Sequence, residues 1–156
     1  MKRVAARVSV VVGSLVALLL GIAVSQAQMK AGTGDVVADR QRLMKLNGAS
    51  LKDLNDKVKA GQIEAMAVNA ETIAVNAQHV PMLFPKGSLT DKSKAKPEIW
   101  EKWSEFEAAA KNLETKAIEL RDVARAKDQP KVEALMKDFG RQACGTCHTP
   151  FRQPQQ

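Results

Sequence analysis

Residues 99–124 read IWEKWSEFEAAAKNLETKAIELRDVA, and this stretch decides the fold. Because an α-helix takes about 3.6 residues per turn, apolar residues at alternating intervals of four and three positions share one side of a helix. The stretch keeps that alternation throughout, at Ile99, Trp103, Phe106, Ala110, Leu113, Ala117, Leu120 and Ala124. Pro97 fits the first turn, where a missing N–H leaves no hydrogen bond unmade. The pattern predicts one unbroken amphipathic helix that packs against other helices.

Three further segments show helical spacing, at about residues 35–60, 62–80 and 130–148. Glycine and proline separate the segments: Gly61 follows the first, and the stretch 80–97, which contains both residue types, precedes the third helix. No part of the sequence alternates apolar and polar residues with a period of two, as a half-buried strand would. The sequence therefore predicts an all-α four-helix bundle with one long loop.

The chain opens with the features of a secretory signal peptide. Three basic residues among the first seven precede an uncharged apolar run at 8–24, and a small-x-small cleavage signature, SQA, ends at Ala27. We expect cleavage after Ala27. The alternative is an uncleaved membrane anchor, although the run is short for a comfortable span.

The mature chain is one domain with a mixed-charge surface. Cleavage leaves 129 residues with 21 basic and 17 acidic side chains, a net charge of +4. The charges alternate in sign, which indicates a solvated helical surface and not a nucleic-acid interface. No nucleophile–base constellation, phosphate loop or pair of carboxylates in an apolar setting is present, so we do not expect an enzyme. We divide the chain into signal peptide 1–27, flexible N-terminus 28–34, bundle 35–152 and tail 153–156.

A Cys-x-x-Cys-His motif lies almost at the C-terminus and holds the only two cysteines, Cys144 and Cys147, followed by His148. On a helix these residues are i, i+3 and i+4, so they share one face. This spacing suits c-type haem attachment, in which two thiols form thioethers with the porphyrin vinyl groups and the histidine binds iron. We favour covalent haem as the cofactor.

Three other uses of the motif stay open at this point. A zinc site needs four ligands, and the only remaining histidine, His79, would complete the count. A structural disulfide is allowed in an exported chain, but so short a loop would stabilise little. A thioredoxin-like redox disulfide would need strands and a motif at a helix start, whereas this one lies near a helix end.

The chain resembles the cytochrome c prime family, the class II c-type cytochromes of the bacterial periplasm. The matching stretches are RQRLMKLNG (40–48), PMLFPKGS (81–88), KPEIWEKWSEF (96–106) and GRQACGTCHTPFR (140–152). The resemblance implies an antiparallel up-down bundle with one haem c. It also implies a periplasmic location with no membrane contact after cleavage, redox partner proteins and a possible homodimer through the first two helices.

The resemblance also implies roles for particular residues. Cys144 and Cys147 would attach the haem, and His148 would ligate the iron. Arg40 and Gln41 would lie near the haem edge; Arg40 and a second arginine, Arg152, would contact the propionates; and Met44 would lie over the distal face. Where the family often has acidic residues after the histidine, this chain has Thr-Pro at 149–150.

Two functions differ in the role that Met44 takes. As an iron ligand opposite His148, its thioether would make a low-spin electron carrier of raised potential. Held off the iron, it would leave a five-coordinate haem that binds nitric oxide or carbon monoxide. The run RLMKLNG looks closer to the methionine-ligated, low-spin branch, so we expect an electron carrier with Met44 as the sixth ligand. His79, the rival ligand, suits a helix C-terminus better.

The remaining methionines and the tryptophans are interpreted as structural. Met66, Met82 and Met136 are expected to fill gaps in the core. Trp103 belongs to the apolar seam, and Trp100 is expected beside it, against the haem or the loop.

Overall fold

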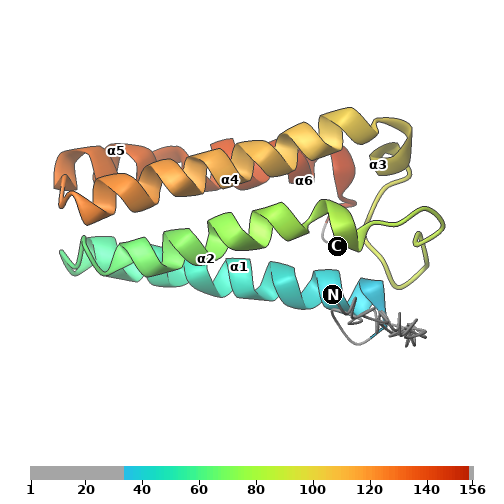
Figure 1. Cartoon of the computed structure of the whole chain (residues 1–156), viewed down its shortest axis with the longest axis horizontal. Helices are drawn as coiled ribbons and strands as arrows, with labels where there is room; N and C mark the ends of the chain where they lie inside the picture. The colour runs from blue at the N-terminus through green and yellow to red at the C-terminus, as the bar shows by residue number, and fades with distance from the viewer. Residues whose placement is uncertain (1–33, 155–156) are drawn as a thin grey trace, which may run out of the picture.

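The computed structural model describes residues 34–154 and shows a four-helix bundle (Figure 1). Its elements are α1 (Val36–Lys59), α2 (Met66–His79), the short helix η1 (Pro81–Leu83), α3 (Glu98–Glu101), α4 (Trp103–Arg125), α5 (Gln129–Phe139), the π-helical turn η2 (Gly140–Gly145) and α6 (Thr146–Phe151). Here α5, η2 and α6 run on from one another as the fourth long segment. The all-α prediction is confirmed: within the described part of the chain the sole β contact is one bridge between Ala95 and Arg152. The predicted signal peptide and its cleavage site lie outside the described residues.

Local signals set the ends of α1. The Asp35 carboxylate accepts hydrogen bonds from the backbone N–H groups of Val37 (2.9 Å) and Ala38 (3.1 Å), which have no partner inside the helix. At the other end Gly61 has a φ of +67°, a left-handed conformation that favours glycine. Its N–H donates to the Val58 carbonyl at 3.2 Å, so the chain turns at once toward α2.

The third predicted helix is not continuous, and this part of the sequence prediction is wrong. It divides at Lys102, whose φ of −120° and ψ of 48° are not helical, into α3 and α4. The indole N–H of Trp100 donates to the carbonyls of Phe84 (3.0 Å) and Pro85 (3.2 Å), which fastens the first turn to the loop. Ile99 is still buried, so the apolar seam continues across the break. Trp100 therefore contacts the loop, which is one of the two neighbours predicted for it.

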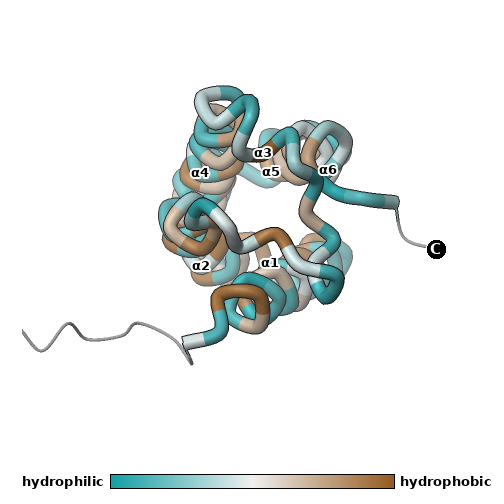
Figure 2. The backbone as a smooth tube through the Cα atoms, turned by 90° about the vertical axis from the view of Figure 1, so that its right-hand side faces the viewer, coloured by the Kyte–Doolittle hydropathy of each residue, from teal (hydrophilic) through white to brown (hydrophobic). Residues whose placement is uncertain are grey.

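Two apolar clusters fill the bundle, and along its axis α1, α2, α4 and the fourth segment surround a common centre (Figure 2). The cluster remote from the loop contains Leu54, Met66, Ile73, Leu120 and Val132, each almost fully buried. The cluster at the loop end is aromatic and contains Phe84, Phe106 and Phe151, with Trp100 and Trp103 against it. The prediction that the methionines fill gaps in the core is confirmed for Met66, which is core, and for Met136, which packs against the core. It is wrong for Met82, which is 70% exposed.

The start of α5 predicts a pH dependence of stability. The Asp128 carboxylate accepts a hydrogen bond from the side chain of Lys131 (2.8 Å) and another from its backbone N–H (3.2 Å), and these contacts lower the pKa of Asp128. Because the native pKa lies below the unfolded one, this stabilisation is present above about pH 4 and is lost as the pH falls through the native pKa.

We expect Asp128→Asn, which keeps a cap acceptor but no titrating charge, to flatten the acid side of the stability curve. Thermal unfolding followed by circular dichroism from about pH 5 to about pH 2 measures it. Parallel curves for the two proteins would contradict the prediction.

Candidate functional site

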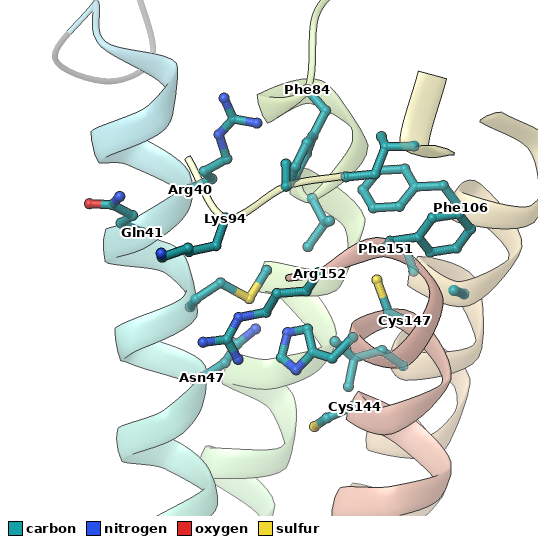
Figure 3. A pocket seen from close by; sticks show the side chains of 18 of the residues that line it. Arg40, Gln41, Asn47, Phe84, Lys94, Phe106, Cys144, Cys147, Phe151 and Arg152 are labelled. Carbon is teal, nitrogen blue, oxygen red and sulfur yellow. The ribbon is translucent and has the colours of Figure 1, made fainter. Parts of the chain in front are cut away.

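A cavity of about 610 Å³ opens at the loop end of the bundle, between α1, α2, the loop, α4 and the fourth segment. The seven residues singled out from the sequence all line it; they are Arg40, Gln41, Met44, Cys144, Cys147, His148 and Arg152. Figure 3 shows Arg40 and Gln41 on α1 across the opening from Cys144 and Cys147. The rival ligand His79 does not line this cavity; it is exposed, and its Nδ1 lies 2.8 Å from the Val75 carbonyl oxygen of its own helix. The predicted place of His79 at the end of α2 is therefore confirmed.

The cavity wall is apolar, and its charges are all positive. Arg40, Lys45, Lys94 and Arg152 line it, and no lining residue is an aspartate or glutamate. An apolar cavity with several cations and no carboxylate favours a flat apolar molecule that carries acid groups. Haem, with its macrocycle and two propionates, is a molecule of this kind, so the lining residues fit it.

Arg40 is the clearest sign that an anion belongs here. Its side chain is only 5% exposed, its Nη2 donates to the Ser88 carbonyl at 2.6 Å, and its guanidinium lies 4.5 Å from the centre of the Phe84 ring. Its Nε and Nη1 are buried without a hydrogen-bond partner. Burial lowers the pKa of Arg40, but an arginine keeps its charge at neutral pH. Buried, charged donors without an acceptor are costly, so a carboxylate bound here would satisfy them.

The C-terminal end of the chain is fastened to the long loop, and this fixes Arg152 at the cavity. The Lys96 N–H donates to the Phe151 carbonyl (3.0 Å), and the Gln153 N–H donates to the Lys94 carbonyl (2.8 Å). On α1, the Gln41 side chain donates to the Lys92 carbonyl at 3.2 Å. The loop is therefore held from both sides, and Lys94 and Arg152 both reach into the opening (Figure 3).

Lys45 and Lys94 were not identified from the sequence. Lys94 belongs to a loop without periodicity, and its place depends on contacts with residues more than fifty positions away. Lys45 is the neighbour of Met44 on α1, and the resemblance implied no role for it. The charge of the cavity, and not any motif, identifies both residues.

Contrary to the prediction from the sequence, the Cys-x-x-Cys-His motif does not lie on one straight α-helix. Cys144 belongs to the π-helical turn η2, and Cys147 and His148 belong to α6. The inward-facing residues of this segment recur every four positions, at the buried Phe139, Ala143 and Phe151 and the half-buried Cys147, and on an α-helix each such step drifts by about 40°. A π turn contains more residues than an α turn, so it compensates this drift and keeps the apolar stripe inside. This spacing was available in the sequence.

The three motif side chains are electrically neutral. Burial raises the pKa of the Cys144 thiol, and burial together with Cys144 raises the pKa of Cys147 to about 11. Burial, and secondarily the charge of Arg152, lowers the pKa of His148. At neutral pH the imidazole therefore keeps a free nitrogen lone pair, which a metal ligand needs.

The alternative uses of the motif find little support. Cys144 and Cys147 are free thiols, which the disulfide alternatives do not explain. The zinc alternative required His79, which lies elsewhere, and residues 34–154 contain no group of three or more His, Cys, Asp or Glu side chains placed to hold a metal ion. Within the same residues no helix is both long and apolar enough to cross a membrane.

Comparison with known proteins agrees with this site. Residues 35–152 match the family model described as Cytochrome C'. The chain is 38% identical over 142 residues to a cytochrome c-556 of Agrobacterium fabrum, covering 87% of this chain and 91% of the relative. It is 32% identical over 118 residues to a cytochrome c' of Pararhodospirillum photometricum, covering 73% and 93%.

Solved structures show the same fold. The cytochrome c' of Rubrivivax gelatinosus superposes with a TM-score of 0.67 at 21% identity, over 77% of this chain and 96% of that one. A nitric oxide complex of a mutant cytochrome c prime from Alcaligenes xylosoxidans gives a TM-score of 0.68 at 25% identity, over 78% and 95%. Together with the cavity and its paired cysteines, these matches show that the chain is a c-type haem protein of the cytochrome c' family, with covalently bound haem c as its cofactor.

Proposed function

We propose that the protein transfers electrons through haem c attached at Cys144 and Cys147, with His148 and Met44 as the axial ligands. The observation that carries the proposal is that Met44 of α1 and His148 of α6 line one cavity together with both cysteines. His148 is the only histidine among the lining residues, and Met44 is the only methionine. Two different helices thus supply one nitrogen and one thioether donor.

The protein's own groups have distinct tasks in this proposal. Bound haem c supplies one-electron redox chemistry. Each cysteine thiol adds across a vinyl C=C bond: its sulfur bonds to one carbon, its hydrogen passes to the other, and no electron is gained or lost. The neutral imidazole of His148 donates its lone pair, and the soft sulfur of Met44 favours ferrous iron, which raises the potential.

Gas binding is the alternative function. Similar solved structures include nitric oxide complexes of cytochrome c prime mutants from Alcaligenes xylosoxidans. In this alternative Met44 is a distal residue that does not ligate the iron. Met44 packs against the aromatic cluster at the loop end, which suits either role.

Replacement of Met44 distinguishes the two functions. We expect the wild-type ferric protein to be low spin with a weak sulfur-to-iron band in the far red. Met44→Ala should abolish that band and allow carbon monoxide to bind the ferrous protein, because the sixth position is then open. Met82→Ala is the matched control, since Met82 is exposed and does not line the cavity. A wild type that is already high spin and binds carbon monoxide rapidly would establish the gas-binding alternative.

We also propose that Arg40 and Arg152 bind the haem propionates. The two unpartnered nitrogens of Arg40 support its role, and the place of Arg152 in the cavity lining supports the second. Gln41 lies at the haem edge in this proposal. Because Arg40 is buried, its contact is expected to contribute more than that of the half-buried Arg152.

Loss of the Arg40 charge should change both potential and stability. Removing a nearby cation stabilises the more positive ferric state, so Arg40→Leu and Arg152→Leu should each lower the midpoint potential. We expect Arg40→Leu also to cost roughly 3 kcal/mol of unfolding free energy, because a buried carboxylate loses its partner. Redox titration and urea unfolding of the holoproteins measure these effects, with the exposed Arg125→Leu as control. If Arg40→Leu matches the control in both, the assignment is wrong.

We further propose export to the periplasm, with cleavage after Ala27, and a homodimer. A basic start, an uncharged apolar run and the small-x-small site support export. One similar solved structure is that of a cytochrome c' with ligand-controlled dimer dissociation. In this chain the exposed apolar residues Leu46 of α1 and Val68 and Val75 of α2 lie on the two helices expected to form such a contact. The redox partner proteins stay unnamed.

Mass spectrometry of protein purified from the periplasm tests attachment, cleavage and assembly together. Under denaturing conditions we expect a chain that begins at Gln28 and carries one haem, because thioethers survive unfolding. Cys144→Ala with Cys147→Ala should remove the haem. Native spectra should show the homodimer. A full-length chain in the membrane fraction would refute cleavage, and haem lost on denaturation would refute thioether attachment.

A further inference from the structure

We propose that Asn112 of α4 is a positioning residue for the haem-attachment turn. Its side-chain amide holds η2 in the π-helical form and thereby places Cys144 relative to Cys147 and His148. This inference rests on the proposed function, in which these three residues attach and ligate the haem. It concerns a residue outside the motif and outside the cavity lining.

The backbone of the attachment turn lacks an α-helical hydrogen bond. In an α-helix the Thr146 N–H would donate to the carbonyl of Gln142, four residues earlier. In this structure the Thr146 N–H is directed at the carbonyl of Cys144 instead. The Gln142 carbonyl therefore lacks its α-helical donor and is open to a donor from elsewhere.

Asn112 supplies that donor. Its Nδ2 donates to the Gln142 carbonyl at 2.7 Å and lies 3.3 Å from the Thr146 hydroxyl oxygen, which accepts the second hydrogen of the amide. The Thr146 hydroxyl in turn donates to the Ala143 carbonyl at 3.2 Å. The two carbonyls immediately before Cys144 are thus both satisfied by side chains, one of them from a helix 30 positions earlier in the sequence.

The network acts where the direction of the cysteines is decided. Ala143 is fully buried and Cys144 lines the cavity, so a turn that relaxed toward α geometry would rotate this part of the apolar stripe. Cys144 and Cys147 are both tethered in the proposed holoprotein. A change of the turn is therefore passed to the macrocycle and to the orientation of His148. Asn112 is consequently expected to influence the electronic state of the site and not only stability.

Replacement of the amide by an uncharged side chain of similar size tests the proposal in the intact holoprotein. Asn112→Leu removes the donor without adding a charge that would itself shift the potential. Asn55→Leu is the matched control, because the Asn55 amide donates to the carbonyl of Leu51 at 2.9 Å on the exposed side of α1. Asn112→Gln keeps an amide donor. The readouts are hydrogen exchange of the amides of residues 142–148, the optical spectra of both oxidation states and the midpoint potential.

We expect exchange at residues 142–148 to be roughly fivefold faster in Asn112→Leu, the cost of one net hydrogen bond. We also expect changed spectra and a shifted potential, whereas Asn55→Leu and Asn112→Gln stay close to wild type. Asn112→Leu with unchanged exchange and spectra overturns the proposal. A uniform increase of hydrogen exchange across the bundle of Asn112→Leu with an unchanged spectrum also overturns it, because it would mean a purely structural role. The proposal is likewise overturned if Asn112→Gln changes exchange and spectra as strongly as Asn112→Leu. A wild type without covalent haem would instead refute the proposed function.

Discussion

A buried guanidinium organises the end of the bundle that holds the site. Arg40 links α1 to the long loop through the Ser88 carbonyl and the face of Phe84. Phe84 packs edge-on against Phe106 of α4, and Phe106 packs edge-on against Phe151 at the end of the chain. One cation and a row of aromatic rings thus join all sides of the cavity except α2. Two nitrogens of Arg40 are buried without a hydrogen-bond partner, which supports the proposal that an anion binds here.

The fourth helical segment meets two requirements that a straight α-helix does not meet together. It must keep apolar residues spaced by four inside the bundle, and it must present two cysteines and a histidine to one cavity. The π turn meets both, and within it the Thr146 N–H does not donate to the Gln142 carbonyl. Asn112 of α4 donates to that carbonyl instead. In our proposal the geometry of the motif therefore depends on a helix that contributes no ligand.

The cavity also explains why membership of the family leaves the function divided. Apolar walls, positive charges and neutral motif side chains suit any haem c with acid groups. Electron transfer and gas binding differ only in whether a thioether occupies the last position on the iron. In the proposed function that choice depends on Met44, which packs against the aromatic cluster and lines the same cavity as His148.

The sequence by itself determined whatever depends on neighbours along the chain. The seam at 99–124, the helix start at Pro97 and the Cys-x-x-Cys-His spacing are local, because helical periodicity and thiol placement follow from positions a few residues apart. The tertiary structure alone decided the break at Lys102, the cations Lys45 and Lys94, the partners of Arg40 and the role of Asn112. Most of these depend on contacts between distant segments; Arg40 and Ser88, for instance, are 48 positions apart. Even the π turn, although its four-residue spacing is visible in the sequence, receives the hydrogen bond from Asn112 only because α4 packs beside it in the bundle.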